Sequence, residues 1–208
     1  EGYEGAYRRL FARDGIEGLR FLEVLGRTYD VVLMNPPFGA PTPSSKELLE
    51  ESYPGVSGDV YACFIERGLR WLVPGGRLGF ITNRTWLGLP QYESLRTRVL
   101  GPLGAVEVAA DLGSFVLDAQ VETVAAVVGR SQPPEYVAPW IRLLKTQAKE
   151  AVLTEALAAH GAGREHRTLY RSSQARFGVL PSSVFGYWMS DQLAGRMTKE
   201  DSVAARGV

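Results

Sequence analysis

The sequence has few of the residues that bind metals or form disulfides. It contains one cysteine, Cys63, and two histidines, His160 and His166, among 208 residues. A single cysteine excludes an internal disulfide and is typical of a reducing compartment, so we expect a cytoplasmic protein. Cys63 lies far from both histidines in the sequence, and no cluster has the spacing of metal ligands. We therefore expect no bound metal.

The chain also lacks a charge imbalance and long apolar runs. Its 23 Lys and Arg residues balance 23 Asp and Glu residues, so the formal net charge is zero. This balance disfavours a stand-alone nucleic-acid module, which usually carries a basic excess, but allows a catalytic core whose DNA-gripping parts lie elsewhere. No signal peptide and no apolar run of about 18 residues is present, so we expect no membrane partner.

The apolar residues that are present alternate between the patterns of strands and helices. Hydrophobic residues make up 45% of the chain and charged residues 22%, as in ordinary globular domains. We predict strands at 30–35, 77–83, 104–113 and 121–130, and helices at 3–27 (with a break), 59–73 and 89–101. The last two strands are too close for a crossover helix, so we expect one of them to run antiparallel. The predicted fold is α/β, with a mostly parallel, partial Rossmann-like sheet.

The character of the chain changes after Pro133-Pro134. The segment "WIRLL" predicts a strand and "KTQAKEAVLTEALAAHG" a helix, and an aromatic, irregular segment follows. We therefore divide the chain into residues 1–134, the α/β part, and residues 135–208, a C-terminal extension or the start of a further region.

The segment Asn35-Pro36-Pro37-Phe38-Gly39 directly follows the first predicted strand. Ligands of open parallel sheets bind at the carboxyl ends of strands. The Asn35 side-chain oxygen and the Pro36 carbonyl can each accept a hydrogen bond from one amino group, and proline fixes the backbone that aims them. Phe38 offers a ring that can stack on a planar base. Two such acceptors localise the lone pair of an exocyclic amine, and a base in duplex DNA must be flipped out to reach them.

These segments resemble amino-group-modifying class I S-adenosylmethionine (SAM) methyltransferases. "DVVLMNPPFG" is similar to their catalytic motif, Asn-Pro-Pro-Phe/Tyr. "GDVYACFIERGLRWLVPGGRLGFITNRTWL" resembles the stretch that follows it in DNA adenine-N6 methyltransferases of combined restriction-modification type. "LGSFVLDAQVETVAAVV" resembles a later motif of the same enzymes. The tail "RFGVLPSSVFGYWMSD" resembles methyltransferases of BREX or phage-growth-limitation defence systems.

The resemblance implies methyl transfer from SAM to the N6 amine of a flipped adenine in double-stranded DNA. It implies that Asn35 and the Pro36 carbonyl hold the amine and that Phe38 stacks on the base. It further implies that Pro37 contacts the substrate and that Phe115 forms a second wall for the adenine.

The resemblance places Asp59 and Tyr61 where the family lines its cofactor and base pockets. Ordinary packing offers an alternative for these residues and for Phe115. Asp59 has the properties of a helix cap, Tyr61 lies on the apolar face of the predicted helix, and Phe115 can fill the core.

Residues 1–34 lack the glycine-rich turn after a strand that binds SAM in this family. We therefore expect the chain to be the C-terminal half of a methyltransferase catalytic domain, with an upstream SAM-binding half as its partner. Three alternatives stay open: an rRNA guanine-N2 methyltransferase, a protein glutamine methyltransferase, and a fragment without catalysis of its own. No sequence feature predicts the oligomeric state.

Overall fold

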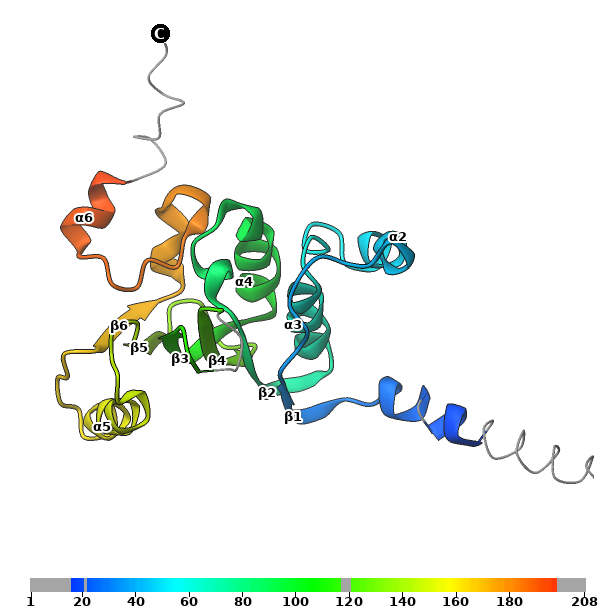
Figure 1. The fold of residues 1–208 in the computed structure, drawn as a ribbon, viewed down its shortest axis with the longest axis horizontal. Coiled ribbons are helices and arrows are strands. Elements are labelled where there is room, and N and C mark those ends of the chain that lie inside the picture. Colours follow the sequence, from blue (N-terminus) through cyan, green and yellow to red (C-terminus); the bar gives the residue numbers. More distant parts are fainter. Residues whose placement is uncertain (1–15, 21, 117–120, 198–208) are drawn as a thin grey trace, which may run out of the picture.

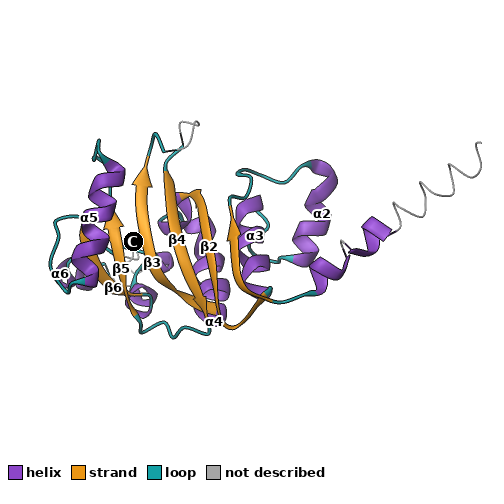
Figure 2. Ribbon diagram, turned by 90° about the horizontal axis from the view of Figure 1, so that it is seen from below, coloured by secondary structure: helices purple, strands orange, loops and turns teal. Residues whose placement is uncertain are grey.

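A single sheet organises the protein in the computed structural model, which describes residues 16–20, 22–116 and 121–197 (Figures 1 and 2). Within these residues, six strands follow the order β1-β2-β4-β3-β5-β6. Their bounds are Tyr29–Met34 (β1), Leu72–Asn83 (β2), Gly104–Gly113 (β3), Thr123–Arg130 (β4), Val137–Arg142 (β5) and Leu169–Ser173 (β6). Strands β1, β2, β3 and β5 share one direction, and β4 and β6 oppose it. The predicted α/β fold with a mostly parallel sheet is confirmed, and of the two neighbouring strands predicted at 104–113 and 121–130 the second, β4, is the antiparallel one.

Helices lie on both faces of this sheet, and most are short. Their bounds are Pro43–Ser52 (α2), Val60–Arg70 (α3), Gly101–Leu103 (α4), Lys149–Gly161 (α5) and Asp191–Arg196 (α6). Single 3₁₀ turns cover Arg84–Leu87, Pro90–Tyr92, Ala175–Val179 and Pro181–Ser183, and a π-helix covers Leu95–Leu100. Much of the helix predicted at 3–27 lies outside the described residues. None of the described helices is long and apolar enough to cross a membrane.

Two helix predictions were wrong in detail. The helix predicted at 59–73 ends at Arg70, because Leu72 already pairs with Tyr29 in the sheet. Pro74-Gly75-Gly76, predicted to stop that helix, instead form a bulge inside β2, where Gly75 has a φ of +80°. The segment 89–101 is a 3₁₀ turn followed by a π-helix, since it must bring the buried Arg96 guanidinium to three backbone carbonyls.

One face of the sheet carries the main core. Helix α3 and the π-helix pack there against β2 and β4, and aromatic side chains of the C-terminal segment complete the cluster. Trp86, after β2, meets Phe185 edge-on, with 5.7 Å between ring centroids. The predicted division at residue 134 stays a prediction, but the structure shows what crosses it: β5 pairs with β3, and both parts share this core.

The opposite face is covered at one end only. Helix α5 packs on β3, β5 and β6 there, while α3 and α4 lie on the other side of the sheet (Figure 1). Towards β1 the face opens into an apolar hollow of about 650 Å³, lined among others by Leu33, Ile81 and Val127. Leu33 is 79% exposed and Val31 57% exposed, although both belong to a strand. An open apolar face beside an unpaired strand edge is where a further part of a protein can pack.

Candidate functional site

Four loops meet at one edge of the sheet, because β1, β2, β3 and β5 run in the same direction (Figure 2). The segment 35–39 follows β1, and 84–87 follows β2. The loop with Phe115 follows β3, and residues 143–148 follow β5. This is the carboxyl edge, where open parallel sheets bind ligands.

The segment after β1 leaves its carboxamide free. Asn35 is exposed and lies at the rim of the apolar hollow, and Pro37 is also exposed. Pro36 is buried and Phe38 is half-buried, so the protein interior holds the backbone between them in place. Gly39 has a φ of +116°, a conformation that strains any residue with a Cβ atom.

Asp59 holds this segment from the N-terminus of α3. Its Oδ1 accepts a hydrogen bond from the Gly39 N–H at 3.0 Å and one from the Tyr61 N–H at 3.3 Å. The Val60 N–H donates in turn to the Gly39 carbonyl at 2.9 Å. Gly39 is thus fixed through both of its backbone polar groups, and the same carboxylate caps the helix.

A chain of contacts links Phe38 through two tyrosines to Asp59. Phe38 meets Tyr61 edge-on, with centroids 6.1 Å apart, and Tyr61 stacks on Tyr92 at 5.5 Å. The Tyr92 hydroxyl donates to Asp59 Oδ2 at 3.1 Å. The Tyr61 hydroxyl lies 3.2 Å from Thr85 Oγ1, and burial raises the pKa of Tyr61, so this hydroxyl stays neutral. These contacts fix the orientation of the Phe38 side chain, which is half-buried.

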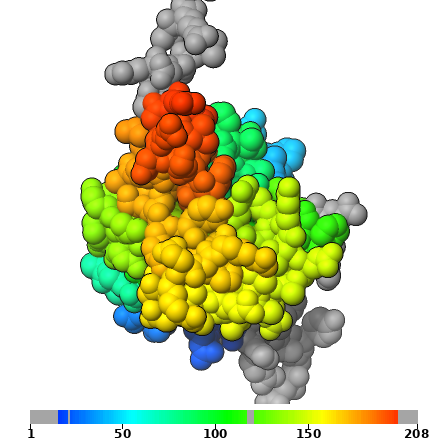
Figure 3. All heavy atoms as spheres, turned by 90° about the vertical axis from the view of Figure 1, so that its left-hand side faces the viewer, coloured from blue at the N-terminus to red at the C-terminus, as the bar shows by residue number. Residues whose placement is uncertain are grey.

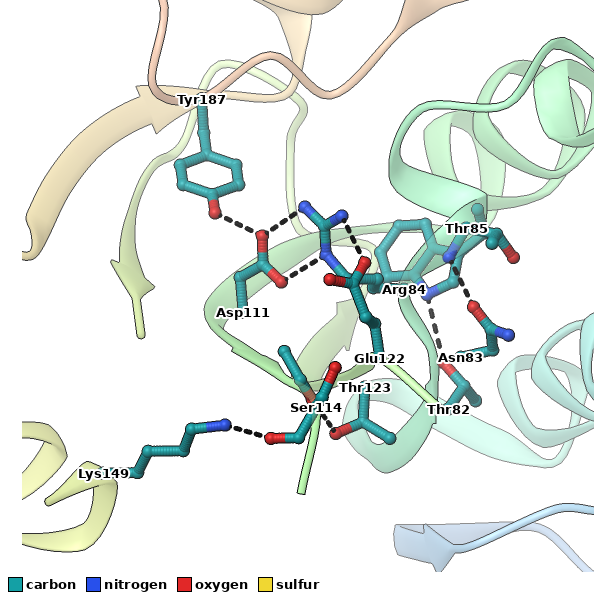
Figure 4. A network of polar contacts seen from close by, with 12 residues as sticks. Thr82, Asn83, Arg84, Thr85, Asp111, Ser114, Glu122, Thr123, Lys149 and Tyr187 are labelled. Atoms are coloured by element: carbon teal, nitrogen blue, oxygen red, sulfur yellow. Dashed lines mark hydrogen bonds and ion pairs between the residues drawn. The ribbon is translucent and has the colours of Figure 1, made fainter. Parts of the chain in front are cut away.

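The loop after β3 presents Phe115 to solvent. Its side chain is 84% exposed and its φ is +64°, a left-handed conformation that is costly for phenylalanine. Lys149 of α5 donates to the Ser114 carbonyl, and Thr123 donates to the Gly113 carbonyl at 3.2 Å (Figure 4). The backbone before Phe115 is therefore anchored on both sides.

An ion pair that was not predicted from the sequence links the loop after β2 to β3 and to the C-terminal segment (Figure 4). Arg84 donates to both oxygens of Asp111, at 2.6 and 2.8 Å, and the Tyr187 hydroxyl donates to Asp111 Oδ2 at 2.6 Å. The hydrogen bonds with Asp111 raise the pKa of Arg84, and burial raises that of Tyr187. The only signal in the sequence was an acidic residue inside the apolar run 104–113.

The structure places six of the seven predicted residues together and leaves Phe115 apart. Four of the six belong to the segment 35–39 after β1, and Asp59 and Tyr61 contact that segment from the start of α3. The loop of Phe115 instead follows β3, and β2 and β4 lie between β1 and β3. About 14 Å therefore separates the two strand backbones. The roles of all these residues stay predictions.

The predicted cofactor contacts have other partners in this structure. Both oxygens of Asp59 accept hydrogen bonds from the protein, and Tyr61 is completely buried. Asp59 and Tyr61 therefore support the segment 35–39 from the protein side and leave no polar group of their own free for a cofactor among the described residues.

Comparison with known proteins identifies the segment around this site. Residues 15–101 match the Eco57I restriction-modification methylase family. The resemblance expected from the sequence is confirmed. The matched segment contains β1, the segment 35–39, α3 and β2.

Individual proteins and structures are similar to a larger share of the chain. The adenine-specific methyltransferase PglX of Lacticaseibacillus casei (strain Zhang) is 25% identical over 186 residues, which cover 83% of this chain and 15% of that protein. A structure of a type I restriction-modification system has a TM-score of 0.60 at 16% identity and covers 81% of this chain and 39% of that one. The type I methyltransferase subunit of Streptococcus thermophilus has a TM-score of 0.57 at 16% identity, with coverages of 74% and 36%. The fold is thus that of restriction-modification methyltransferases, and the chain spans about 15% of the length of its curated relative.

Proposed function

We propose that this chain forms the methyl-accepting half of a DNA adenine-N6 methyltransferase of a restriction-modification or phage-defence enzyme. The observation that carries the proposal is the segment 35–39, which lies at the carboxyl end of β1, is fixed by Asp59 and leaves Asn35 exposed. Its place inside the matched methylase segment and the name of the relative PglX support adenine as the substrate.

The proposed chemistry uses two acceptors on one amine. The Asn35 side-chain oxygen and the Pro36 carbonyl each accept a hydrogen bond from the adenine N6 group. The nitrogen lone pair is then less delocalised into the adenine ring. That lone pair would form the new N–C bond as the bond between the methyl carbon and the sulfonium sulfur breaks and the thioether leaves, and one N6 proton would be released after transfer. No side chain of the segment is a strong base, so the rate gain comes from positioning and electrostatics.

The aromatic side chains hold the flipped base in the proposed complex. Phe38 stacks on one face of the adenine, in the orientation that its edge contact with Tyr61 sets. Pro37 contacts the same base beside it. Phe115, exposed on an anchored loop, approaches from the other side as the second wall.

SAM, when bound, supplies a methyl group on an electron-poor sulfonium. We propose that an upstream half of the protein binds it, and that this half packs on the apolar hollow and pairs with the open edge of β1. The exposed Leu33 and Val31 support this position, since a solvent-facing strand rarely carries such residues. Asn35 lies at the rim of the same hollow, so the two halves meet at the acceptor site.

Acceptor specificity tests the proposal. The full-length protein that contains this chain is incubated with labelled SAM and, separately, unmethylated duplex DNA, rRNA and a glutamine peptide. We expect label in the DNA, and a loss of about 10²–10³-fold in Asn35→Ala, the size typical of removing one polar group that binds the transition state. Gln132→Ala, which removes a carboxamide in the turn after β4, is the matched control and keeps full activity.

Each alternative has its own outcome in this experiment. Label in the rRNA or in the peptide contradicts DNA as the substrate. No transfer to any of the three acceptors supports a chain that only contacts partners. Transfer to DNA that survives in Asn35→Ala contradicts the role of the segment 35–39.

A further inference from the structure

A second pocket opens at the carboxyl edge of the sheet, beyond the residues of the proposed methyl-acceptor site. It has a volume of about 650 Å³ and lies between the end of β5, the loop before α5 and the start of β6. Three of its lining residues are cations, Arg142, Lys145 and Arg167, and none is acidic. This side of the molecule, built from α5 and the segments after it, faces the viewer in Figure 3.

The three cations are not neutralised within the part of the chain that the structure describes. None of them forms an ion pair there, whereas the neighbouring Arg171 and Arg176 pair with Glu165 and Asp191. The Arg142 guanidinium packs 5.0 Å from the Trp188 ring, and its Nε is buried without a hydrogen-bond partner among the described residues. Lys145 and Arg167 are exposed at the mouth. A concave surface that gathers three unpaired cations favours an anion.

Helix α5 adds to the positive potential of this pocket. Its N-cap, Ala148, lines the pocket and provides no side-chain cap, so first-turn N–H groups are left without a side-chain acceptor. The one acidic residue of that turn, Glu150, lines the neighbouring hollow beside Phe115. The combination of guanidinium, ammonium and helix N-terminus is the chemistry that recognises a phosphate.

The position of the pocket relates it to the acceptor site. β5 runs parallel to β1 and is four strand positions away in the sheet, a separation of about 19 Å. At a rise of about 3.4 Å per nucleotide along one strand of DNA, this distance corresponds to about five or six nucleotides.

We propose that the pocket of Arg142, Lys145 and Arg167 binds a backbone phosphate of the substrate DNA, about five or six nucleotides from the flipped adenine. This inference rests on the proposed function, because that function makes DNA the source of the phosphate. The contact fixes the register of the duplex on the enzyme and carries no sequence information itself.

Phosphate replacement tests the contact without methyl transfer. Duplexes with one neutral methylphosphonate at each position around the target adenine are bound to the full-length protein. We expect one position, about five or six nucleotides away, to weaken binding about tenfold, the effect of losing a charge-assisted contact. In the double variant Lys145→Gln/Arg167→Gln the natural duplex binds about tenfold more weakly, and that methylphosphonate has no further effect. Arg142 is kept because it packs on Trp188.

A control removes two cations that already form ion pairs at the opposite edge of the sheet, as Arg70→Gln/Arg77→Gln. The dependence of log affinity on log salt becomes shallower by about 0.9 in the pocket variant only. Equal salt slopes in both variants, or no methylphosphonate position whose effect depends on Lys145 and Arg167, overturn the inference. If methyl transfer to DNA then still depends on Asn35, the proposed function stands without it. If wild type binds DNA through the pocket but methylates no DNA, the proposed function fails and the contact remains.

Discussion

At the scale of single residues, Asp59 combines two tasks that are usually separate. Its carboxylate caps α3 through the Tyr61 N–H and holds the segment 35–39 through the Gly39 N–H. The second oxygen accepts from Tyr92, which stacks on the ring that orients Phe38. A substitution at Asp59 is therefore expected to displace Phe38 in two ways, through the backbone at Gly39 and through the contacts of Tyr92 and Tyr61.

Asp59→Ala is expected to lower kcat about 10–100-fold, because a displaced segment misplaces both amine acceptors. The free energy of unfolding falls by about 1 kcal/mol from the lost cap. Asp59→Asn keeps one acceptor oxygen and recovers most of the activity, and Tyr92→Phe, which removes a single donor, has a smaller effect. Steady-state kinetics on DNA measure this, and a kcat for Asp59→Ala equal to that of wild type contradicts the positioning role.

Cys63 gives a pH-dependent test of the core. Burial raises the pKa of its thiol to about 11, so the thiolate is scarce at pH 8 and alkylation of the folded protein is expected to be at least 100-fold slower than that of a free cysteine. Because folding raises this pKa, the unfolded state loses the proton first, and stability falls as the pH rises from about 9 towards 11. Mass spectrometry after timed alkylation measures the rate, and a fast reaction at pH 8 contradicts the packing of α3.

At the scale of elements, β1 differs from the other parallel strands. Among the described residues it pairs with β2 alone, and one of its faces borders the apolar hollow. Val32 and Met34 pack against the main core, while the alternate residues Val31 and Leu33 are exposed. Such a strand is apolar on both faces, as in the interior of a parallel sheet, although it is an edge strand here. These exposed apolar residues fit the proposed packing of an upstream half on the outer side of β1.

Leu33→Asp tests whether the outer face of β1 is exposed in this chain and buried in the full-length protein. In the 208-residue chain the substitution is expected to shift Tm by no more than about 1 °C, because Leu33 is already exposed. In the full-length protein it places a charge in the proposed contact with the upstream half, and we expect a loss of about 3 kcal/mol in stability together with weaker SAM binding. Melting curves of both proteins measure this, with Thr42→Asp on the exposed start of α2 as the control. An equal response of the two proteins contradicts the proposed packing.

At the scale of the whole molecule, much of the sheet could be predicted from the sequence, but the way its parts interlock could not. The apolar runs at 104–113 and 121–130 contain enough β-branched residues to predict β3 and β4, and the spacing predicted an antiparallel strand. Likewise, the segment 35–39 was placed correctly at the end of β1. The contact between Asp111 and Tyr187 spans 76 residues, and no local pattern predicts it. The π-helix also lacks a local signal, since it depends on the distant carbonyl of Ser182.

Truncation at residue 134 tests whether residues 1–134 fold independently of residues 135–208. A protein ending at residue 134 loses Phe185 from its contact with Trp86 and leaves the Asp111–Arg84 pair without its tyrosine donor. It also loses β5 from the edge of β3. We expect no cooperative thermal transition for residues 1–134, and a clear one for residues 1–197. A cooperative melt of the shorter protein, followed by circular dichroism, contradicts the shared core and supports the division at 134.

The proposed role of the segment 35–39 is tested most directly by the position of the methyl group on the product. DNA is treated with the full-length protein, digested to nucleosides and analysed by mass spectrometry, for wild type and for Asn35→Ala. We expect N6-methyladenine from wild type and, under the same conditions, about 10²–10³-fold less from the variant. Methylation at another atom, or an equal yield of N6-methyladenine from the variant, contradicts the proposal that the segment 35–39 holds the adenine amine.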